Sequence, residues 1–283
     1  MHNGKNAYPG AVDCITRIAE AGKKIILLSN SSKRKGGAIN SLTRMGFPME
    51  GIEVVTSGEL AWQGLTERKL EPFKSLGTRC LTLGSGDEDL PYLEECGLTP
   101  ADASAADFVL CRGVFSMATG DKLELFSPNI LGKEEVEEQL RTARLRRIPM
   151  LVTNPDFVRP GGNEPMPGRI GQEYAEGGGT VHYVGKPHNG VYECCYSLLE
   201  GAGVSVEKAK ICAVGDSLRH DVQGAINQGM KSAFIMSGIH AAELGLKECE
   251  ESSPPEGDAA LAALYKTHLA EGVPDRSMPT FKW

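Results

Sequence analysis

Short apolar runs alternate along the chain with segments whose apolar residues recur at helical spacing, a pattern typical of α/β proteins. The runs predict strands over residues 24–28, 54–55, 79–83, 107–112, 149–153, 181–184, 211–214 and 233–236. The periodic segments predict helices over residues 10–21, 34–45, 56–65, 87–96, 133–147, 167–175, 191–199, 217–229 and 259–269. Uninterrupted apolar runs are typical of strands buried on both faces, so we expect parallel sheets covered by helices.

The middle of the chain has its own succession of strands and helices, which lies between two halves of another α/β unit. This order is typical of a domain inserted into a loop of a second domain. We therefore predict a first core segment at residues 1–70, an inserted α/β domain at residues 71–180 and a second core segment at residues 181–283.

The composition excludes several classes of protein. With 41% hydrophobic and 24% charged residues, the 283-residue chain resembles ordinary soluble globular proteins. No apolar run approaches the roughly 20 residues that span a bilayer, and residues 1–5 have no signal-peptide or transit-peptide character, so we expect a cytoplasmic protein. The net charge of −7 argues against a nucleic-acid or anionic-membrane surface. The eight cysteines form no C-x-x-C pair, which indicates free thiols in a reducing compartment.

The stretch from Ile211 to Asp221 carries the strongest chemical signal. Its apolar strand ends in a Gly-Asp-Ser turn, and the carboxyl ends of strands in open α/β sheets are where ligands bind. Asp216 and Asp221 together suggest a hard cation such as Mg²⁺, with phosphate as its companion. The alternative is that Asp216 and Ser217 only cap the following helix.

A second polar strand end is Ser29-Asn30-Ser31-Ser32. Its hydroxyl and amide groups can bind phosphate oxygens, or they can form a helix N-cap cluster. The cations of residues 33–35 would oppose the dipole of the helix that follows, so an anion beside them would be stabilising.

Lys186 follows the strand at residues 181–184 and precedes Pro187, which restricts its backbone. It is either a directed site residue or a surface lysine. Asn154 and Asp156 lie in a polar turn after another strand, where they either face a ligand or form an Asx turn.

Gly84-Ser85-Gly86 is interpreted as an ordinary turn and not as a dinucleotide-binding loop. Asp89 stands where the third glycine would be, and Asp87 would repel a pyrophosphate. This disfavours a nucleotide-dependent oxidoreductase.

The order of these strand ends resembles the haloacid dehalogenase (HAD) superfamily of phosphohydrolases, subfamily IIA. The resemblance covers essentially the whole chain. The stretches that carry it are Tyr8-Pro9-Gly10-Ala11, Leu28-Ser29-Asn30-Ser31-Ser32, Val152-Thr153-Asn154-Pro155-Asp156, Val184-Gly185-Lys186-Pro187 and Val214-Gly215-Asp216-Ser217 with Asp221. It implies a Rossmann-like parallel-sheet core with an inserted α/β cap of the C2 type.

The resemblance also implies a role for each residue and a Mg²⁺-dependent hydrolysis of a small phosphate monoester. Ser29, Lys186 and Asp221 would be catalytic, Asp216 would bind Mg²⁺, and the remaining residues would contact the substrate: Asn30, Ser31, Asn154 and Asp156. Phosphoryl transfer needs such charge neutralisation. The resemblance is compatible with a homodimer formed through the cap.

One departure from the family pattern concerns its first motif. His2-Asn3-Gly4 resembles the tail of that motif, so we expect the nucleophilic aspartate and its strand to be missing from these 283 residues. Asp13 is no substitute because it belongs to a predicted helix. The sequence thus leaves two hypotheses, a phosphatase impaired in this form and a non-catalytic phosphate-binding or scaffolding relative.

Overall fold

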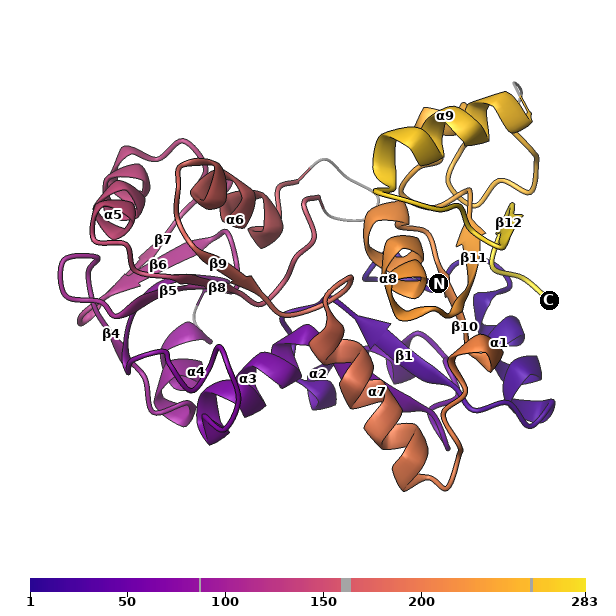
Figure 1. The fold of residues 1–283 in the computed structure, drawn as a ribbon, viewed down its shortest axis with the longest axis horizontal. Coiled ribbons are helices and arrows are strands. Elements are labelled where there is room, and N and C mark those ends of the chain that lie inside the picture. Colours follow the sequence, from indigo (N-terminus) through magenta and orange to yellow (C-terminus); the bar gives the residue numbers. More distant parts are fainter. Residues whose placement is uncertain (87, 159–163, 255–256) are drawn as a thin grey trace.

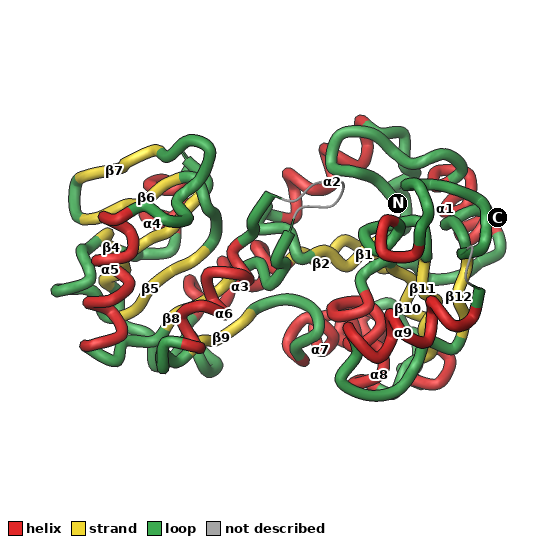
Figure 2. Tube along the Cα trace, turned by 90° about the horizontal axis from the view of Figure 1, so that it is seen from above, coloured by secondary structure: helices red, strands yellow, loops and turns green. Residues whose placement is uncertain are grey.

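The computed structural model describes residues 1–86, 88–158, 164–254 and 257–283 and has two lobes (Figure 1). The inserted domain forms one lobe, and most of the two core segments fold together into the other. Ala61 and Leu65, which were predicted to belong to the first core segment, pack instead in an apolar cluster of the inserted domain. Figure 2 shows that the chain passes between the lobes near α3 (Ser57–Glu67) and β9 (Val181–Tyr183). Within the described ranges, every helix is too short or too polar to span a bilayer.

The inserted domain is built on one mixed sheet of seven strands, in the order β7-β6-β3-β5-β8-β9 with β4 beside β3. Its strands are β3 (Arg79–Gly84), β4 (Thr99–Pro100), β5 (Phe108–Cys111), β6 (Ser116–Thr119), β7 (Lys122–Leu125), β8 (Met150–Val152) and β9. Phe108 and Leu110 of β5 belong to one apolar cluster, and Val109 and Cys111 belong to another. The central strands are therefore buried on both faces, as predicted.

The hairpin β6–β7 is absent from the predicted elements. β6 pairs antiparallel with β3, and β7 pairs with β6 at the edge of the sheet. β7 reads Lys-Leu-Glu-Leu and is partly exposed, so it has none of the apolar continuity that marks the buried strands.

β9 corrects the predicted boundary between the inserted domain and the second core segment. Met150, Leu151 and Val152 of β8 pair with its three residues in parallel, so the strand that was predicted to open the core at residue 181 belongs to the inserted sheet. The chain re-enters the core after Tyr183. A short strand in the sequence does not show which sheet it joins.

The core strands form two parallel sheets in the described structure. β1 (Ile26–Ser29) pairs with β2 (Glu53–Thr56), while β10 (Cys212–Gly215) pairs with β11 (Lys231–Ile235), which also pairs with the unpredicted β12 (Arg276–Met278). The prediction of full burial is wrong for β1 and β10. β1 is half-buried, and Val214 of β10 is 44% exposed. Each is paired on one side only among the described strands, which leaves its other side less covered.

The helices agree with the predicted segments in type and approximate position. They are α1 (Ala11–Glu20), α2 (Lys35–Arg44), α3, α4 (Asp89–Glu95), α5 (Glu134–Leu145), α6 (Pro167–Glu176), α7 (Asn189–Gly201), α8 (Gln223–Gln228) and α9 (Asp258–His268). Thr56 caps α3, because its hydroxyl accepts a hydrogen bond of 3.1 Å from the amide of Glu59. All eight cysteines are free thiols, as predicted.

The turn at Gly84–Gly86 is an ordinary turn, as predicted. The amides of Ser85 and Gly86 donate to the carboxylate of Asp89 at 3.2 and 2.8 Å, so this side chain occupies the donors that a pyrophosphate would need. The carboxylate is fully buried and pairs with Arg112. Asp87 lies outside the described residues.

Candidate functional site

Asp216 follows the last residue of β10, and Asp221 lies in the turn after it. The helix predicted over residues 217–229 begins instead as a π-helical turn at Leu218–Val222, followed by α8. This wide turn brings Asp221 back toward the strand end, where its Oδ2 accepts a hydrogen bond of 3.0 Å from the amide of Ser217. Such turns are frequent at functional sites.

The two interpretations of the strand end, helix capping and ligand binding, apply to different residues. The Ser217 hydroxyl caps the turn by accepting from the amide of His220 at 3.2 Å. Asp216 makes no such cap; its Oδ2 accepts a hydrogen bond of 3.0 Å from the amide of Ile239. A Cβ at Gly238 would lie 2.2 Å from the Asp216 side chain, so glycine leaves room for this carboxylate.

The electrostatic environment of Asp216 fits a hard cation. Burial and then the charge of Asp221 raise the pKa of Asp216, while the α-amino group of Met1 opposes the shift. A bound divalent ion would offset the cost of holding two carboxylates in one buried region. Carboxylate oxygens are the donors that a hard cation such as Mg²⁺ prefers, so Asp216 could hold one here.

Lys186 and Asp221 form a buried ion pair, which rules out the surface-lysine alternative. The Lys186 Nζ donates to Asp221 Oδ1 at 2.7 Å and to the carbonyl oxygen of Leu28 at 3.0 Å. The side chains of Lys186 and Asp221 are only 16% and 13% exposed. Leu28 precedes Ser29, so the ammonium group lies beside the predicted phosphate-binding strand end.

The ion pair shifts both pKa values away from the range in which either group would lose its charge. Burial is the largest single influence and would lower the pKa of Lys186, but the charge and hydrogen bond of Asp221, together with the charges of Asp156 and Asp216, outweigh it and the pKa is raised. Burial would raise the pKa of Asp221, but the Lys186 charge and its hydrogen bond lower it. The site therefore holds a permanent cation.

Asn30 joins three segments of the site through its side chain. Its Nδ2 donates to Asp156 Oδ1 at 2.9 Å and to the Lys186 carbonyl at 3.2 Å, and its Oδ1 accepts from the Lys186 amide at 2.7 Å. These bonds use both amide hydrogens. The side chain of Asn30 therefore holds these segments together, and its backbone is the part of the residue that can bind a ligand.

The predicted catalytic residue Ser29 and the predicted substrate-binding residues Ser31 and Asn154 accept local hydrogen bonds from nearby backbone amides. Asn154 forms the Asx turn, because its Oδ1 accepts from the amide of Asp156 at 3.0 Å. Ser29 Oγ accepts from the amide of Ser31 at 3.2 Å, and Ser31 Oγ accepts from Lys33 at 3.2 Å. Both serine hydroxyls keep a hydrogen for donation.

Two of the three cations after this strand end are paired with carboxylates elsewhere. Arg34 lies 2.8 Å from Glu59 and stacks 3.5 Å over the Trp62 ring, and Lys35 pairs with Glu53 at 2.9 Å. These glutamates stabilise the cationic start of α2, so the position of Arg34 and Lys35 there does not require a phosphate beside them.

His220 also lies among these residues, although it was not one of the predicted site residues. Its Nδ1 lies 3.3 Å from Asp156 Oδ1 and 3.0 Å from the Ser217 hydroxyl. Burial lowers the pKa of His220, and Asp156 opposes that shift. Its position between Asp216 and Asp221 is the sequence feature that could have indicated that His220 lies near the site.

Two protein-family models match parts of this chain. A family model described as haloacid dehalogenase-like hydrolase matches residues 1–99, and one described as HAD-hydrolase-like matches residues 183–264. The two ranges contain every predicted site residue except Asn154 and Asp156.

Relatives and solved structures align over most of the chain. Chronophin of Homo sapiens is 26% identical over 249 residues, covering 86% of this chain and 80% of chronophin. The 4-nitrophenylphosphatase of Schizosaccharomyces pombe is 24% identical over 285 residues, covering 94% and 90% respectively. The structure of a haloacid dehalogenase-like hydrolase from Brucella suis 1330 superposes with a TM-score of 0.71 at 26% identity, covering 99% of this chain and 91% of that one.

Proposed function

The chain belongs to the haloacid dehalogenase-like hydrolases, and from this membership we propose that it is a Mg²⁺-dependent phosphatase of a small phosphate monoester. The observation that carries the proposal is the buried pair of Lys186 and Asp221 next to the end of β1. It holds a cation beside the strand end that carries Ser29, and this cation also feels the charge of the Asp216 carboxylate. A phosphoryl group needs these hydrogen-bond donors and charges around it.

Each residue has a distinct task in this proposal. Ser29 and the backbone of Asn30 bind phosphoryl oxygens. Lys186 neutralises their charge, and Asp221 holds Lys186 in place. Asp216 would hold Mg²⁺, which when bound supplies charge stabilisation to the phosphate oxygens. Ser31 contributes a second hydroxyl, while Asn154 and Asp156 shape the border with the inserted domain.

The carboxylates described at this site lead us to propose slow turnover for the 283-residue chain. Asp221 is paired with Lys186, and Asp156 is bonded to Asn30 and lies near His220. Asp216 is the proposed metal ligand. None of these described carboxylates is left to attack phosphorus, so we propose a site that binds phosphate well and hydrolyses esters poorly.

The alternative is a non-catalytic phosphate-binding or scaffolding protein, and turnover separates the two. We would measure release of phosphate from p-nitrophenyl phosphate and a panel of small phosphate monoesters, with Mg²⁺ and with EDTA. We expect weak hydrolysis that depends on Mg²⁺ and disappears in Asp216→Asn. Hydrolysis that is unchanged by EDTA and by Asp216→Asn would refute the proposal.

Binding of inorganic phosphate, measured by calorimetry in Mg²⁺, tests the site without turnover. We expect Ser29→Ala to weaken phosphate binding about 10- to 150-fold, which corresponds to the roughly 1.5–3 kcal/mol of one hydrogen bond to a charged group. Ser32→Ala is the matched control, because the Ser32 hydroxyl donates at 2.7 Å to the carbonyl of Arg112 and faces the inserted domain. Phosphate binding without any hydrolysis supports the scaffolding alternative, and equal losses in both variants contradict the assigned site.

We propose a reducing compartment, the cytoplasm, because all eight cysteines are free thiols. Fluorescent tagging in cells tests this proposed compartment.

We also propose a homodimer through the inserted domain, where Leu125 of the edge strand β7 is 60% exposed and Leu145 is 80% exposed. Light scattering of wild type and Leu145→Glu tests this proposed homodimer.

A further inference from the structure

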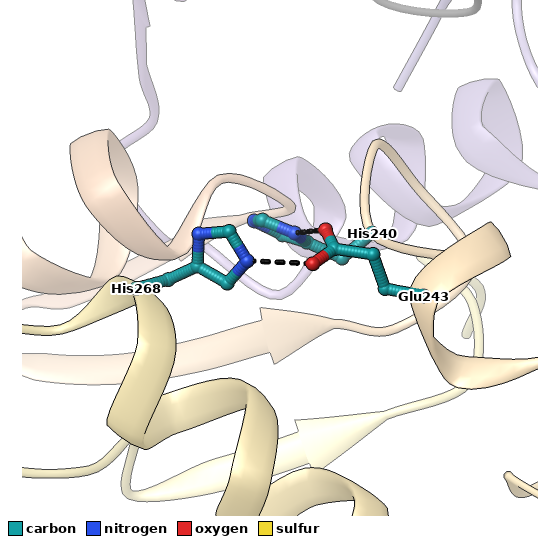
Figure 3. A group of neighbouring side chains, drawn as sticks. All are labelled: His240, Glu243 and His268. Carbon is teal, nitrogen blue, oxygen red and sulfur yellow. Dashed lines mark hydrogen bonds and ion pairs between the residues drawn. The ribbon is translucent and has the colours of Figure 1, made fainter.

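A second group of metal-ligating side chains lies where the loop after β11 meets the end of α9 (Figure 3). His240 precedes the short 3₁₀ turn η3 (Ala242–Leu244), Glu243 lies in that turn, and His268 is the last residue of α9. One ligand atom from each of the three residues lies within 4.8 Å of the others. Figure 3 shows the two imidazole rings next to each other, with a dashed line from each to the Glu243 carboxylate.

The Glu243 carboxylate is shared by the two histidines. Its Oε1 lies 2.6 Å from His240 Nδ1, and its Oε2 lies 2.7 Å from His268 Nε2. The two ring centroids are 4.4 Å apart. In the described part of the chain no lysine or arginine pairs with Glu243, so the imidazoles are the groups gathered around its charge.

We propose that His240, Glu243 and His268 bind a divalent transition-metal ion of the Zn²⁺ class. Two imidazole nitrogens and one carboxylate form a typical three-residue Zn²⁺ ligand set, with water in the fourth position. Mg²⁺ prefers oxygen ligands throughout, so this site selects a different ion from the one proposed at Asp216. The inference does not depend on the proposed phosphatase function.

The side chains can reach the required geometry by small rotations. Ligand atoms around a tetrahedral Zn²⁺ lie about 3.3 Å apart, given bonds of about 2.0–2.1 Å. The present separations, from 2.6 Å to at most 4.8 Å, lie on both sides of this value. His240 is buried, whereas the Glu243 side chain is 46% exposed and can move and admit the water ligand.

Metal binding would cost one long hydrogen bond of His240. The Nε2 of this ring accepts from the amide of Leu218 at 3.4 Å, so its hydrogen now resides on Nδ1. A metal at Nδ1 requires the other tautomer, with the hydrogen on Nε2, and the Leu218 bond is lost. A bond of that length contributes little compared with a metal–imidazole bond.

The site would join α9 to the segment that supports Asp216. Ile239, whose amide donates to Asp216, is the neighbour of His240. An ion at His240, Glu243 and His268 would therefore hold the last turn of α9 against this segment and raise the stability of the fold. The expected signature is a Zn²⁺-dependent increase in Tm.

The test is a metal titration of tag-free, EDTA-stripped protein in excess Mg²⁺, which keeps Asp216 occupied. We expect one equivalent of Zn²⁺ by calorimetry and a Tm increase. Co²⁺ should give the visible absorption of a four-coordinate nitrogen and oxygen site, without the near-ultraviolet thiolate band that binding to the free cysteines would give. His268→Gln and Glu243→Gln should each lose more than about 10-fold in affinity, and His182→Gln in the inserted domain should lose none.

Three results would overturn the inference. They are the absence of Zn²⁺ binding by wild type, a Co²⁺ spectrum dominated by thiolate, and equal affinity in wild type and His268→Gln. The variants are first compared without metal by circular dichroism, and Glu243→Gln serves if His268→Gln is unfolded. Because none of these readouts uses hydrolysis, a failed phosphatase assay leaves them unaffected.

Discussion

Replacing Lys186 with methionine removes the cation from the buried ion pair at the centre of the proposed site. The Lys186 Nζ lies 2.7 Å from Asp221 Oδ1 and 3.0 Å from the Leu28 carbonyl. Methionine has a similar length, so the main change is the loss of charge and of these two hydrogen bonds. Asp221 keeps its bond from the Ser217 amide but has no cation beside it.

The expected cost is large relative to the total stability of the domain. Removing one partner of a buried ion pair destabilises a protein by about 3–5 kcal/mol, because the other charge remains buried. A whole domain is stable by only about 5–15 kcal/mol. The double variant Lys186→Met with Asp221→Asn carries no charge here, so we expect it to recover at least half of the loss.

The pH dependence has a definite sign. The pKa of Asp221 is lowered in the folded wild type, so this pair contributes stability above the ordinary aspartate pKa, and that contribution is lost as pH falls through the folded value. In Lys186→Met, burial without the cation raises the pKa of Asp221 instead. Its charged form then opposes folding, so the defect should be largest at neutral pH and shrink on acidification.

The assay is urea unfolding followed by circular dichroism, at neutral pH and at the lowest pH at which wild type is folded. Lys210→Met is the matched control, because Lys210 pairs with Glu207 at a similar 2.8 Å but both side chains are more than half exposed. Such surface pairs contribute about 0–1 kcal/mol. A loss below about 1 kcal/mol in Lys186→Met, or a double variant as unstable as the single one, would refute the reasoning.

Three other predictions test neighbouring parts of the structure. Asp216→Asn should abolish the Mg²⁺-induced rise in Tm. It should not lower the stability of the metal-free protein at neutral pH, because burial and Asp221 raise the pKa of this carboxyl and its charge opposes folding. A normal rise in Tm with Mg²⁺ would contradict the assignment of Asp216 as the metal ligand. Arg112→Met should lower the free energy of urea unfolding by about 3–5 kcal/mol, because it leaves the fully buried Asp89 without its cation. A loss under about 1 kcal/mol would show that the hydrogen bonds from Ser116 and from the amides of Ser85 and Gly86 are enough to stabilise the carboxylate. Thr56→Ala should cost about 1–2 kcal/mol and Thr56→Ser much less, since serine keeps the cap of α3; equal costs would exclude capping as the cause.

Local patterns in the sequence predicted most helices and strands because burial periodicity and helix ends depend on near neighbours. The apolar runs of β5 and β8 indicated burial on both faces, and the structure agrees. The pattern failed for β7, whose polar residues carry no such signal, and for β1 and β10, whose exposure depends on what lies beside them.

The sequence by itself determined which residues end the strands, and family resemblance assigned their chemistry. The tertiary structure decided how they meet. Asn30 bonds Asp156 across 126 positions, and Lys186 reaches the Leu28 carbonyl across 158. The tertiary structure also decided that β9 joins the inserted sheet and that His268 lies beside Glu243. These contacts depend on the packing of distant segments, and no local periodicity encodes that packing.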